Sequence, residues 1–159
     1  MKNASSNSPS LTLRPMQPAD VEKVLRIEEK CFPDPWPRTA FEDIIKHREH
    51  GALVAIHEKN LIAYVCYLII AHEAHLTNLA VTPEFRRKSA ATQLLDTVLQ
   101  TAQRKECEYV LLEVRPRNES AIAFYEKAGF RLLYRRPKYY RNPVEDALVM
   151  VYYFSEGEG

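Results

Sequence analysis

Residues 109–130 read YVLLEVRPRNESAIAFYEKAGF, and this stretch decides the fold class because it places a strand directly before a helix. Alternate residues share a strand face: Leu111, Glu113 and Arg115 on one, Val110, Leu112 and Val114 on the other. Asn118 suits the N-cap of the following helix, and Gly129 suits its C-terminal stop. The stretch therefore predicts a strand over 109–115 and a helix over 118–128.

The flanking sequence extends this pattern in both directions. β-rich segments predict strands over 11–14, 52–57, 61–70, 75–81, 131–134 and 147–154, the last two forming a hairpin around a long polar loop. Periodic apolar residues predict helices over 17–31, 39–47 and 90–102. Residues 58–60 have the length of a hairpin turn, and three prolines make 32–37 a stiff loop that carries Trp36. This order predicts an α/β (α+β) fold, with one mixed sheet and helices on its faces.

Length and charge bound the class of protein. A chain of 159 residues with 46% hydrophobic content is expected to form one domain, here 11–154, between a disordered leader (1–10) and a flexible tail (155–159). Its 22 basic and 21 acidic residues give a net charge of +1, which argues against a general polyanion binder. No apolar run reaches the ~18 residues of a membrane span.

The cysteines and glycines exclude several kinds of site. Cys31, Cys66 and Cys107 form neither an even set nor a CxxC spacing, so we expect no disulfide framework and no metal site, and a cytoplasmic location. The four glycines lack the spacing of a GxGxxG or GxxxxGK[ST] loop, which argues against Rossmann and P-loop chemistry.

A cluster of cations lies at the start of the long helix. Arg86, Arg87 and Lys88 precede Ser89, where the free backbone N–H groups of a helix start would favour a bound phosphate. The alternative is a solvated charge run ahead of the helix.

Two residues near the strand–helix junction have the chemistry of an acid–base pair. Glu113 follows apolar strand residues, and partial burial would suit it to act as a general base; the alternative is an ion pair with Arg115 at the strand end. Tyr125 is predicted to point inward from its helix, either as a packed core tyrosine or as a proton donor to a departing thiolate.

Together, these segments resemble the GNAT superfamily of acyl-CoA-dependent N-acetyltransferases. The resemblance rests on residues 79–91, on Leu112-Glu113-Val114-Arg115, and on Asn118 followed by 121–130. Within the superfamily, the chain is most similar to the RimI-type ribosomal-protein-alanine N-acetyltransferases. That similarity rests on Cys31-Phe32-Pro33-Asp34-Pro35-Trp36, on the same LEVR run at 112–115, on Arg135-Arg136 before Tyr139-Tyr140, and on Glu145-Asp146-Ala147 before Met150. The match spans about residues 11–154.

The resemblance implies a splayed mixed sheet of about seven strands with helices on both faces, and acetyl-CoA wedged between the strands at 79–81 and 112–115. It implies Glu113 as the base, Tyr125 as the acid and no metal. It also implies a set of cofactor contacts: Leu79, Ala80, Val81, Arg86, Arg87, Lys88, Ser89, Ala90, Ala91, Thr92 and Asn118. An amine is nucleophilic only when neutral, so a base must act before it attacks the thioester.

Ser89 departs from the pattern of the superfamily, whose pyrophosphate loop normally has glycine at this position. We expect helical φ and ψ angles at Ser89, which need no glycine, and therefore expect acetyl-CoA binding to survive.

Three functions fit these observations. The first is acetylation of a protein N-terminal α-amine, with an alanine of a ribosomal protein as the implied acceptor and with Trp36, Tyr139 and Tyr140 walling the peptide channel. The second is acetylation of a lysine side chain or of a small amine. The third is a non-catalytic module whose basic and aromatic segment 131–141 contacts RNA, which the near-zero net charge disfavours.

Overall fold

The computed structural model describes residues 10–86 and 89–154. Within these ranges it contains one sheet of seven strands: β1 (Thr12–Pro15), β2 (His50–His57), β3 (Asn60–Ile70), β4 (Glu73–Val81), β5 (Tyr109–Val114), β6 (Arg131–Tyr140) and β7 (Glu145–Tyr153). The α-helices are α1 (Val21–Cys31), α2 (Arg38–Lys46), α3 (Ala90–Arg104) and α4 (Glu119–Ala128), and single 3-10 turns precede α1 and α3. The mixed α/β fold with about seven strands is therefore confirmed.

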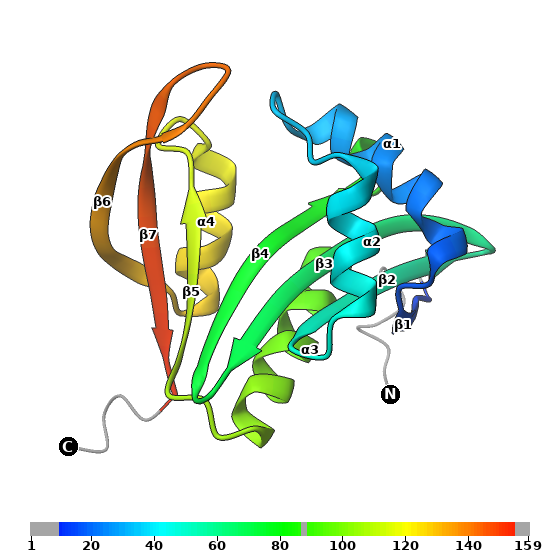
Figure 1. Ribbon diagram of the computed structural model, residues 1–159, viewed down its shortest axis with the longest axis horizontal. Helices are drawn as coiled ribbons and strands as arrows, with labels where there is room; N and C mark the ends of the chain where they lie inside the picture. Colours follow the sequence, from blue (N-terminus) through cyan, green and yellow to red (C-terminus); the bar gives the residue numbers. More distant parts are fainter. Residues whose placement is uncertain (1–9, 87–88, 155–159) are drawn as a thin grey trace, which may run out of the picture.

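The sheet is split between β4 and β5. Its spatial order is β1-β2-β3-β4-β5-β7-β6, and β4 with β5 is its parallel pair among antiparallel neighbours. These two strands pair only from Glu73–Tyr109 to His75–Leu111 and then diverge into a V (Figure 1). The expected splay is thus present, and the main-chain groups that face the opening have no partner across it.

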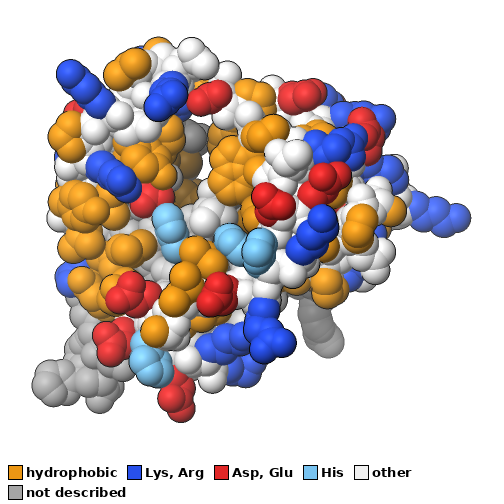
Figure 2. Space-filling view, in the orientation of Figure 1, with side chains coloured by type: hydrophobic (Ala, Val, Ile, Leu, Met, Phe, Trp, Pro, Cys, Tyr) orange, Lys and Arg blue, Asp and Glu red, His pale blue; other side chains and the backbone are white. Residues whose placement is uncertain are grey.

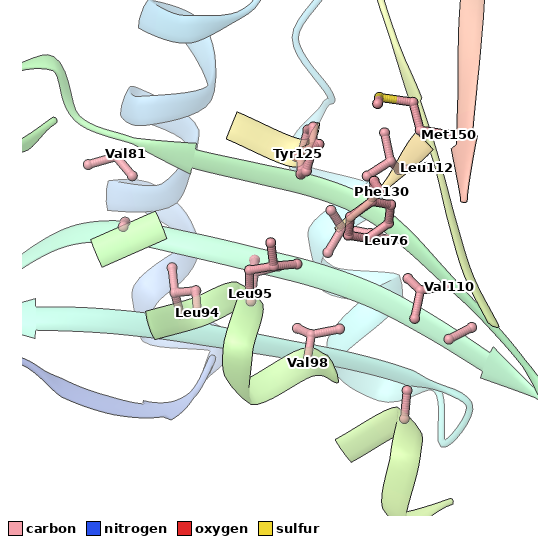
Figure 3. Packing of buried hydrophobic residues seen from close by; sticks show 14 of the residues in the cluster. Leu76, Val81, Leu94, Leu95, Val98, Val110, Leu112, Tyr125, Phe130 and Met150 are labelled. Carbon is pink, nitrogen blue, oxygen red and sulfur yellow. The ribbon is translucent and has the colours of Figure 1, made fainter. Parts of the chain in front are cut away.

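Each face of the sheet carries its own helices and its own core. Helices α1 and α2 cover one face, where Val21, Val24 and Phe41 pack with Val54 and Tyr64. Helices α3 and α4 cover the other face (Figure 1). There the apolar stripe of α3 meets the sheet, and Tyr125 and Phe130 lie beside Leu112 (Figure 3): Leu94, Leu95, Val98, Val110, Leu112, Tyr125 and Phe130 all belong to this cluster.

Local signals in the sequence account for these elements. Alternate burial along β5 leaves Val110, Leu112 and Val114 in the core, as its pattern predicts. The Asn118 side chain caps α4 by accepting a hydrogen bond from the Ala121 amide at 3.2 Å. A two-residue turn closes the β2–β3 hairpin at residues 58–59, both with positive φ.

The C-terminal hairpin differs from its prediction. Strand β6 continues to Tyr140 instead of ending at residue 134, and β7 begins at Glu145, so the expected long polar loop shrinks to residues 141–144. Pro137 lies within β6 because this is an edge strand, which needs no N–H for a neighbour on its open side. The register of β6 against β7 is irregular between Arg136 and Tyr140, where β6 has more residues than the facing part of β7, and Lys138 in this bulge has φ 50°.

The first helix also begins later than predicted. A 3-10 turn over Pro18–Asp20 precedes α1, which starts at Val21. Residues 1–9 of the expected leader and the expected tail at 155–159 lie outside the described residues. In the described ranges, no helix is long and apolar enough to span a membrane.

Candidate active site

A cavity of about 430 Å³ occupies the opening between β4 and β5. Figure 2 shows the surface hollowed between the β5–β7 part of the molecule and the part covered by α1 and α2. The cavity brings together seven of the residues predicted for the site: Trp36, Leu79, Glu113, Asn118, Tyr125, Tyr139 and Tyr140. These residues come from five segments of the chain: the loop before α2, β4, β5, α4 with its N-cap, and β6.

Glu113 reaches the cavity from the β5 face that is turned away from α4. Its side chain is 13% exposed, and its Oε1 lies 2.7 Å from His75 Nε2 on β4. The alternative interpretation, an ion pair between Glu113 and Arg115, is wrong. Arg115 instead bonds Glu145 Oε1 at 2.8 Å, which leaves the Glu113 carboxylate to His75 and the cavity.

Tyr125 reaches the same cavity from α4. Its ring packs edge-on against Phe124 and Phe130, and the residue is 8% exposed. Burial raises the pKa of the Tyr125 phenol, which therefore carries its proton at neutral pH. Tyr125 is a packed core tyrosine, as one interpretation expected, and it also lines the cavity.

Aromatic side chains border the cavity on two sides. The Trp36 ring packs against Phe41 at a centroid distance of 5.4 Å. On the opposite side, Tyr139 and Tyr140 meet edge-on at 4.9 Å at the end of β6, and the Arg115 guanidinium lies 4.3 Å from the centre of the Tyr140 ring. These rings form a rigid wall with polar edges, which suits a peptide channel.

Glu28 is a cavity residue that the sequence analysis missed. It is 1% exposed and accepts three hydrogen bonds: from the Tyr64 hydroxyl, from Asn78 Nδ2 at 2.8 Å and from the Trp36 amide at 2.9 Å. Burial raises the pKa of Glu28, although these donors oppose that shift. Its position in the apolar stripe of α1, four residues after Val24, is the signal that could have revealed it.

The backbone at Ser89 contradicts the sequence prediction. Ser89 adopts φ 70° and ψ 1°, the left-handed conformation, and not helical angles. Two hydrogen bonds hold it there: Ser89 O accepts from the Gln93 amide at 2.9 Å, and Ser89 Oγ accepts from Gln93 Nε2 at 3.0 Å. The position therefore has the backbone for which the superfamily uses glycine.

The other predicted cofactor residues that the structure describes are not among the residues lining the cavity. Ala80 and Val81 are buried in β4, and residues 90–92 form the first turn of α3, whose amides precede its first helical hydrogen bond. The Arg86 guanidinium is turned away from this turn and contacts Val81 O at 3.2 Å and Cys31 Sγ at 3.1 Å. Arg87 and Lys88 lie outside the described residues.

The basic segment 131–141 is largely engaged within the hairpin. Arg135 pairs with Asp146 at 3.1 Å, and Arg136 lies 4.7 Å from the centre of the Tyr139 ring. These contacts match a solvated hairpin better than an open RNA surface. Across 10–86 and 89–154, no group of three or more His, Cys, Asp or Glu side chains has a metal-binding arrangement.

Comparison with known proteins gives one consistent result. Residues 21–130 match the acetyltransferase (GNAT) family. The [ribosomal protein bS18]-alanine N-acetyltransferase of Escherichia coli K12 is 28% identical over 141 residues, which cover 87% of this chain and 95% of that protein. An N-alpha-acetyltransferase of Saccharolobus solfataricus is 29% identical, covering 87% of this chain and 90% of that protein. A crystal structure of the E. coli ribosomal-protein-S18-alanine N-acetyltransferase superposes with a TM-score of 0.83 at 25% identity, over 91% of this chain and 94% of that one.

Proposed function

The chain belongs to the acetyltransferase (GNAT) family, and on that premise we propose that it transfers the acetyl group of acetyl-CoA to the N-terminal α-amine of a protein. The observation that carries the proposal is the joint presence of Glu113 and Tyr125 in one cavity. The relatives support the acceptor class: one is named for an alanine of ribosomal protein bS18 and another for N-alpha-acetylation. A ribosomal protein that begins with alanine is accordingly the proposed acceptor.

Glu113 is the proposed base. An α-ammonium group must lose a proton before its nitrogen attacks, and a carboxylate at the cavity wall takes that proton directly or through one water. The nitrogen then forms a bond to the thioester carbonyl carbon, and the carbonyl oxygen gains negative charge. Beyond His75, β4 keeps its pairing with β3 but has no β5 partner, so the main-chain N–H groups of β4 on the side of the opening are the proposed donors to that oxygen.

Tyr125 is the proposed acid. When the carbon–sulfur bond breaks, the departing thiolate needs a proton, and a buried phenol with a raised pKa still carries one. Tyr125 lies on the α4 side of the opening, across the sheet from Glu113. This placement suits attack by the acceptor amine from the Glu113 side and departure of the thiolate on the Tyr125 side.

The donor site combines two features of the described residues. The opening between β4 and β5 offers strand edges for the thioester arm, and Asn118 lies at its rim with its amide nitrogen free to donate while Oδ1 caps α4. The first amides of α3, at Ala90, Ala91 and Thr92, are the proposed seat of the pyrophosphate. No metal enters the proposed reaction.

The acceptor side favours a chain terminus over a free small molecule. Trp36 and the Tyr139–Tyr140 pair wall the cavity from two sides, as a groove for a peptide requires. Acetylation of a lysine side chain or of a small amine remains the competing activity, because the same base and acid would serve it.

Two measurements test the proposal. Acetyl-CoA at ~100 times its dissociation constant should stabilise the protein by ~2.7 kcal/mol in a thermal unfolding experiment. The second measurement incubates enzyme and acetyl-CoA with two peptides of equal sequence. One has a free N-terminal alanine and a blocked lysine, and the other has a blocked N-terminus and a free lysine.

Mass spectrometry then locates the acetyl group. Modification of the first peptide alone supports the proposal. Modification of the second peptide alone contradicts the α-amine proposal and supports the competing activity. Acetylation of a polyamine, offered in a parallel reaction, while neither peptide is modified has the same meaning. Absence of any stabilisation by acetyl-CoA would contradict the donor site itself.

A further inference from the structure

His75 lies at the vertex of the opening in the sheet. It forms, with Leu111, the last residue pair before β4 and β5 diverge (Figure 1). Paired residues of neighbouring strands share a sheet face, and Glu113 lies two residues beyond Leu111 on that face. The His75 side chain therefore spans the first gap in the ladder and reaches Glu113, with Nε2 at 2.7 Å from Oε1.

This contact acts where β5 has lost its neighbour on one side. Beyond Leu111, β5 has no β4 partner, and its pairing with β7, which places Glu113 opposite Val149, fixes the backbone of Glu113 but not the orientation of its carboxyl group. A hydrogen bond of this length between an imidazole nitrogen and a carboxyl oxygen holds the carboxyl group in one orientation. His75 is thus placed to orient the proposed base.

The two side chains of the pair also differ in their exposure to solvent. The Glu113 side chain is 13% exposed, whereas that of His75 is 36% exposed. A proton taken up in the cavity must leave before the next turnover, and an imidazole can both accept and release a proton through its ring nitrogens. The imidazole belongs to the more exposed partner of the pair.

We propose that His75 is a positioning residue that orients Glu113 and passes on to solvent the proton that Glu113 takes from the acceptor ammonium. This inference rests on the proposed function. The proton moves from the Glu113 carboxyl to His75, which restores the carboxylate and gives an imidazolium. The imidazolium then loses a proton to water, which restores the neutral imidazole.

Other titratable groups face the same cavity and enter any pH profile. Burial raises the pKa of the Tyr139 and Tyr140 phenols on β6, and the Glu113 charge adds to each shift. Glu28 on α1, Asp34 before α2, Arg115 on β5 and Tyr125 on α4 also line it. Variants of His75 leave all of these groups in place, so a change in the profile reports on the pair itself.

The test compares three single variants with the wild-type chain. His75→Ala removes both orientation and relay, whereas His75→Gln keeps an N–H donor but cannot carry a proton. His57→Ala is the matched control: this β2 histidine also has a carboxylate neighbour, with His57 Nε2 at 3.8 Å from Glu58 Oε1, but that carboxylate, unlike Glu113, does not line the cavity. We expect His75→Ala to lower kcat at least ~10-fold, less than the loss expected on removing the base. Stabilisation by acetyl-CoA should be unchanged, and His57→Ala should behave as the wild type.

Two further readouts separate a relay from a merely structural role. Imidazole added to the buffer should restore part of the His75→Ala rate and none of the Glu113→Gln rate. In His75→Gln, the pH profile of kcat should differ from that of the wild type, because the glutamine side chain cannot take up the proton that the imidazole takes up.

The outcomes distinguish this inference from the proposed function. A slow Glu113→Gln enzyme together with normal His75→Ala kinetics overturns the role of His75 alone. A slow His75→Ala enzyme that imidazole does not rescue, with an unshifted profile in His75→Gln, also overturns the relay. A normal Glu113→Gln enzyme overturns the proposed base, and the inference with it.

Discussion

Glu113 and Tyr125 line one cavity although they belong to opposite faces of the sheet. Tyr125 packs with Leu112 in the core beneath α3 and α4, whereas Glu113, the next residue along β5, points to the other face. The two side chains meet a common space only because β4 separates from β5 after His75. The opening in the sheet is therefore what joins a base and an acid in one site.

The first prediction concerns the base. Glu113→Gln keeps the shape of the side chain but removes its ability to take a proton. We expect kcat/KM to fall by ~10²-fold or more. Stabilisation by acetyl-CoA should be unchanged, as thermal unfolding with and without the ligand will show. Glu126→Gln, an exposed change on α4, serves as control. Unchanged turnover in Glu113→Gln would reject the assignment.

The second prediction concerns the acid. Tyr125→Phe removes one hydroxyl and keeps the ring between Phe124 and Phe130. We expect kcat to fall by ~10²-fold while the free energy of unfolding changes by no more than about 1 kcal/mol. Steady-state rates and urea unfolding check the two parts. Tyr134→Phe, on the exposed edge strand, should alter neither quantity. If Tyr125→Phe shows normal kinetics, Tyr125 is a core residue only.

Much of the fold follows from short-range signals that the sequence displays. The alternation along β5, the N-cap at Asn118 and the apolar stripe of α3 depend only on neighbours in the chain, and each appears in the structure as predicted. The hairpin of β6 and β7 was predicted too short because Pro137 and the cations around it indicate a loop. An edge strand tolerates both, but no local signal shows which strand will be the edge.

Only the part of the site that depends on neighbouring residues in the chain could be predicted from the sequence. Glu113 and Tyr125 belong to one recognisable strand–helix motif. Glu28 and His75 are important through contacts with residues far along the chain, at Asn78 and Glu113. Their partners are fixed by tertiary packing, and one sequence alone gives no distance between such segments. The prediction of helical angles at Ser89 was wrong because serine adopts them without strain, and no local signal in the sequence showed that the residue before α3 is left-handed.

The third prediction uses that conformation. Ser89→Gly and Ser89→Ala both lose the hydroxyl that accepts from Gln93, so they differ only in the methyl group. In a helix, alanine is the more stable of the two by about 1 kcal/mol. At φ 70° the order should reverse, because an L side chain costs roughly 1–2 kcal/mol there. Urea unfolding of the two variants measures the sign. A more stable alanine variant would contradict the left-handed backbone.

The affinity for acetyl-CoA is a second test of the Ser89 backbone. If the pyrophosphate rests on the first amides of α3, the glycine variant should bind the ligand at least as tightly as the wild type, since it adopts the required backbone without strain. A weaker complex in Ser89→Gly would show instead that the Ser89 hydroxyl contributes to binding.

The fourth prediction concerns the hydrogen bonds that Glu28 accepts beside Trp36 in the cavity wall. Glu28→Ala leaves the Tyr64 hydroxyl, the Asn78 amide and the Trp36 amide without their shared acceptor. An unsatisfied buried donor, here the Tyr64 hydroxyl, costs ~1–3 kcal/mol, and the half-buried amides of Asn78 and Trp36 cost less, so we expect a loss of roughly 3 kcal/mol in the free energy of unfolding. The neighbouring exposed change Glu29→Ala should cost less than ~0.5 kcal/mol. Equal stability of the two variants would contradict the buried network.

The fifth prediction is a pH dependence of stability. Asp20 accepts from both terminal nitrogens of Arg14, at 2.7 and 2.9 Å, and from the Gln17 amide at 2.8 Å. The hydrogen bonds to Arg14 are the largest cause that lowers the pKa of Asp20. A carboxyl group whose pKa is lowered by folding stabilises the protein above its unfolded pKa, here about 4, and that stability is lost as the pH falls through the folded value.

Asp20→Asn tests this sign. At pH 7 we expect the variant to be less stable than the wild type by about 1–2 kcal/mol. The difference should shrink as the pH is lowered below ~4, because protonation of Asp20 removes the same charge that the substitution removes. Urea unfolding at a series of pH values measures it, with the exposed Asp96→Asn as control. A difference that stays constant down to the most acidic pH would mean that the Arg14 contact does not depend on the charge of Asp20.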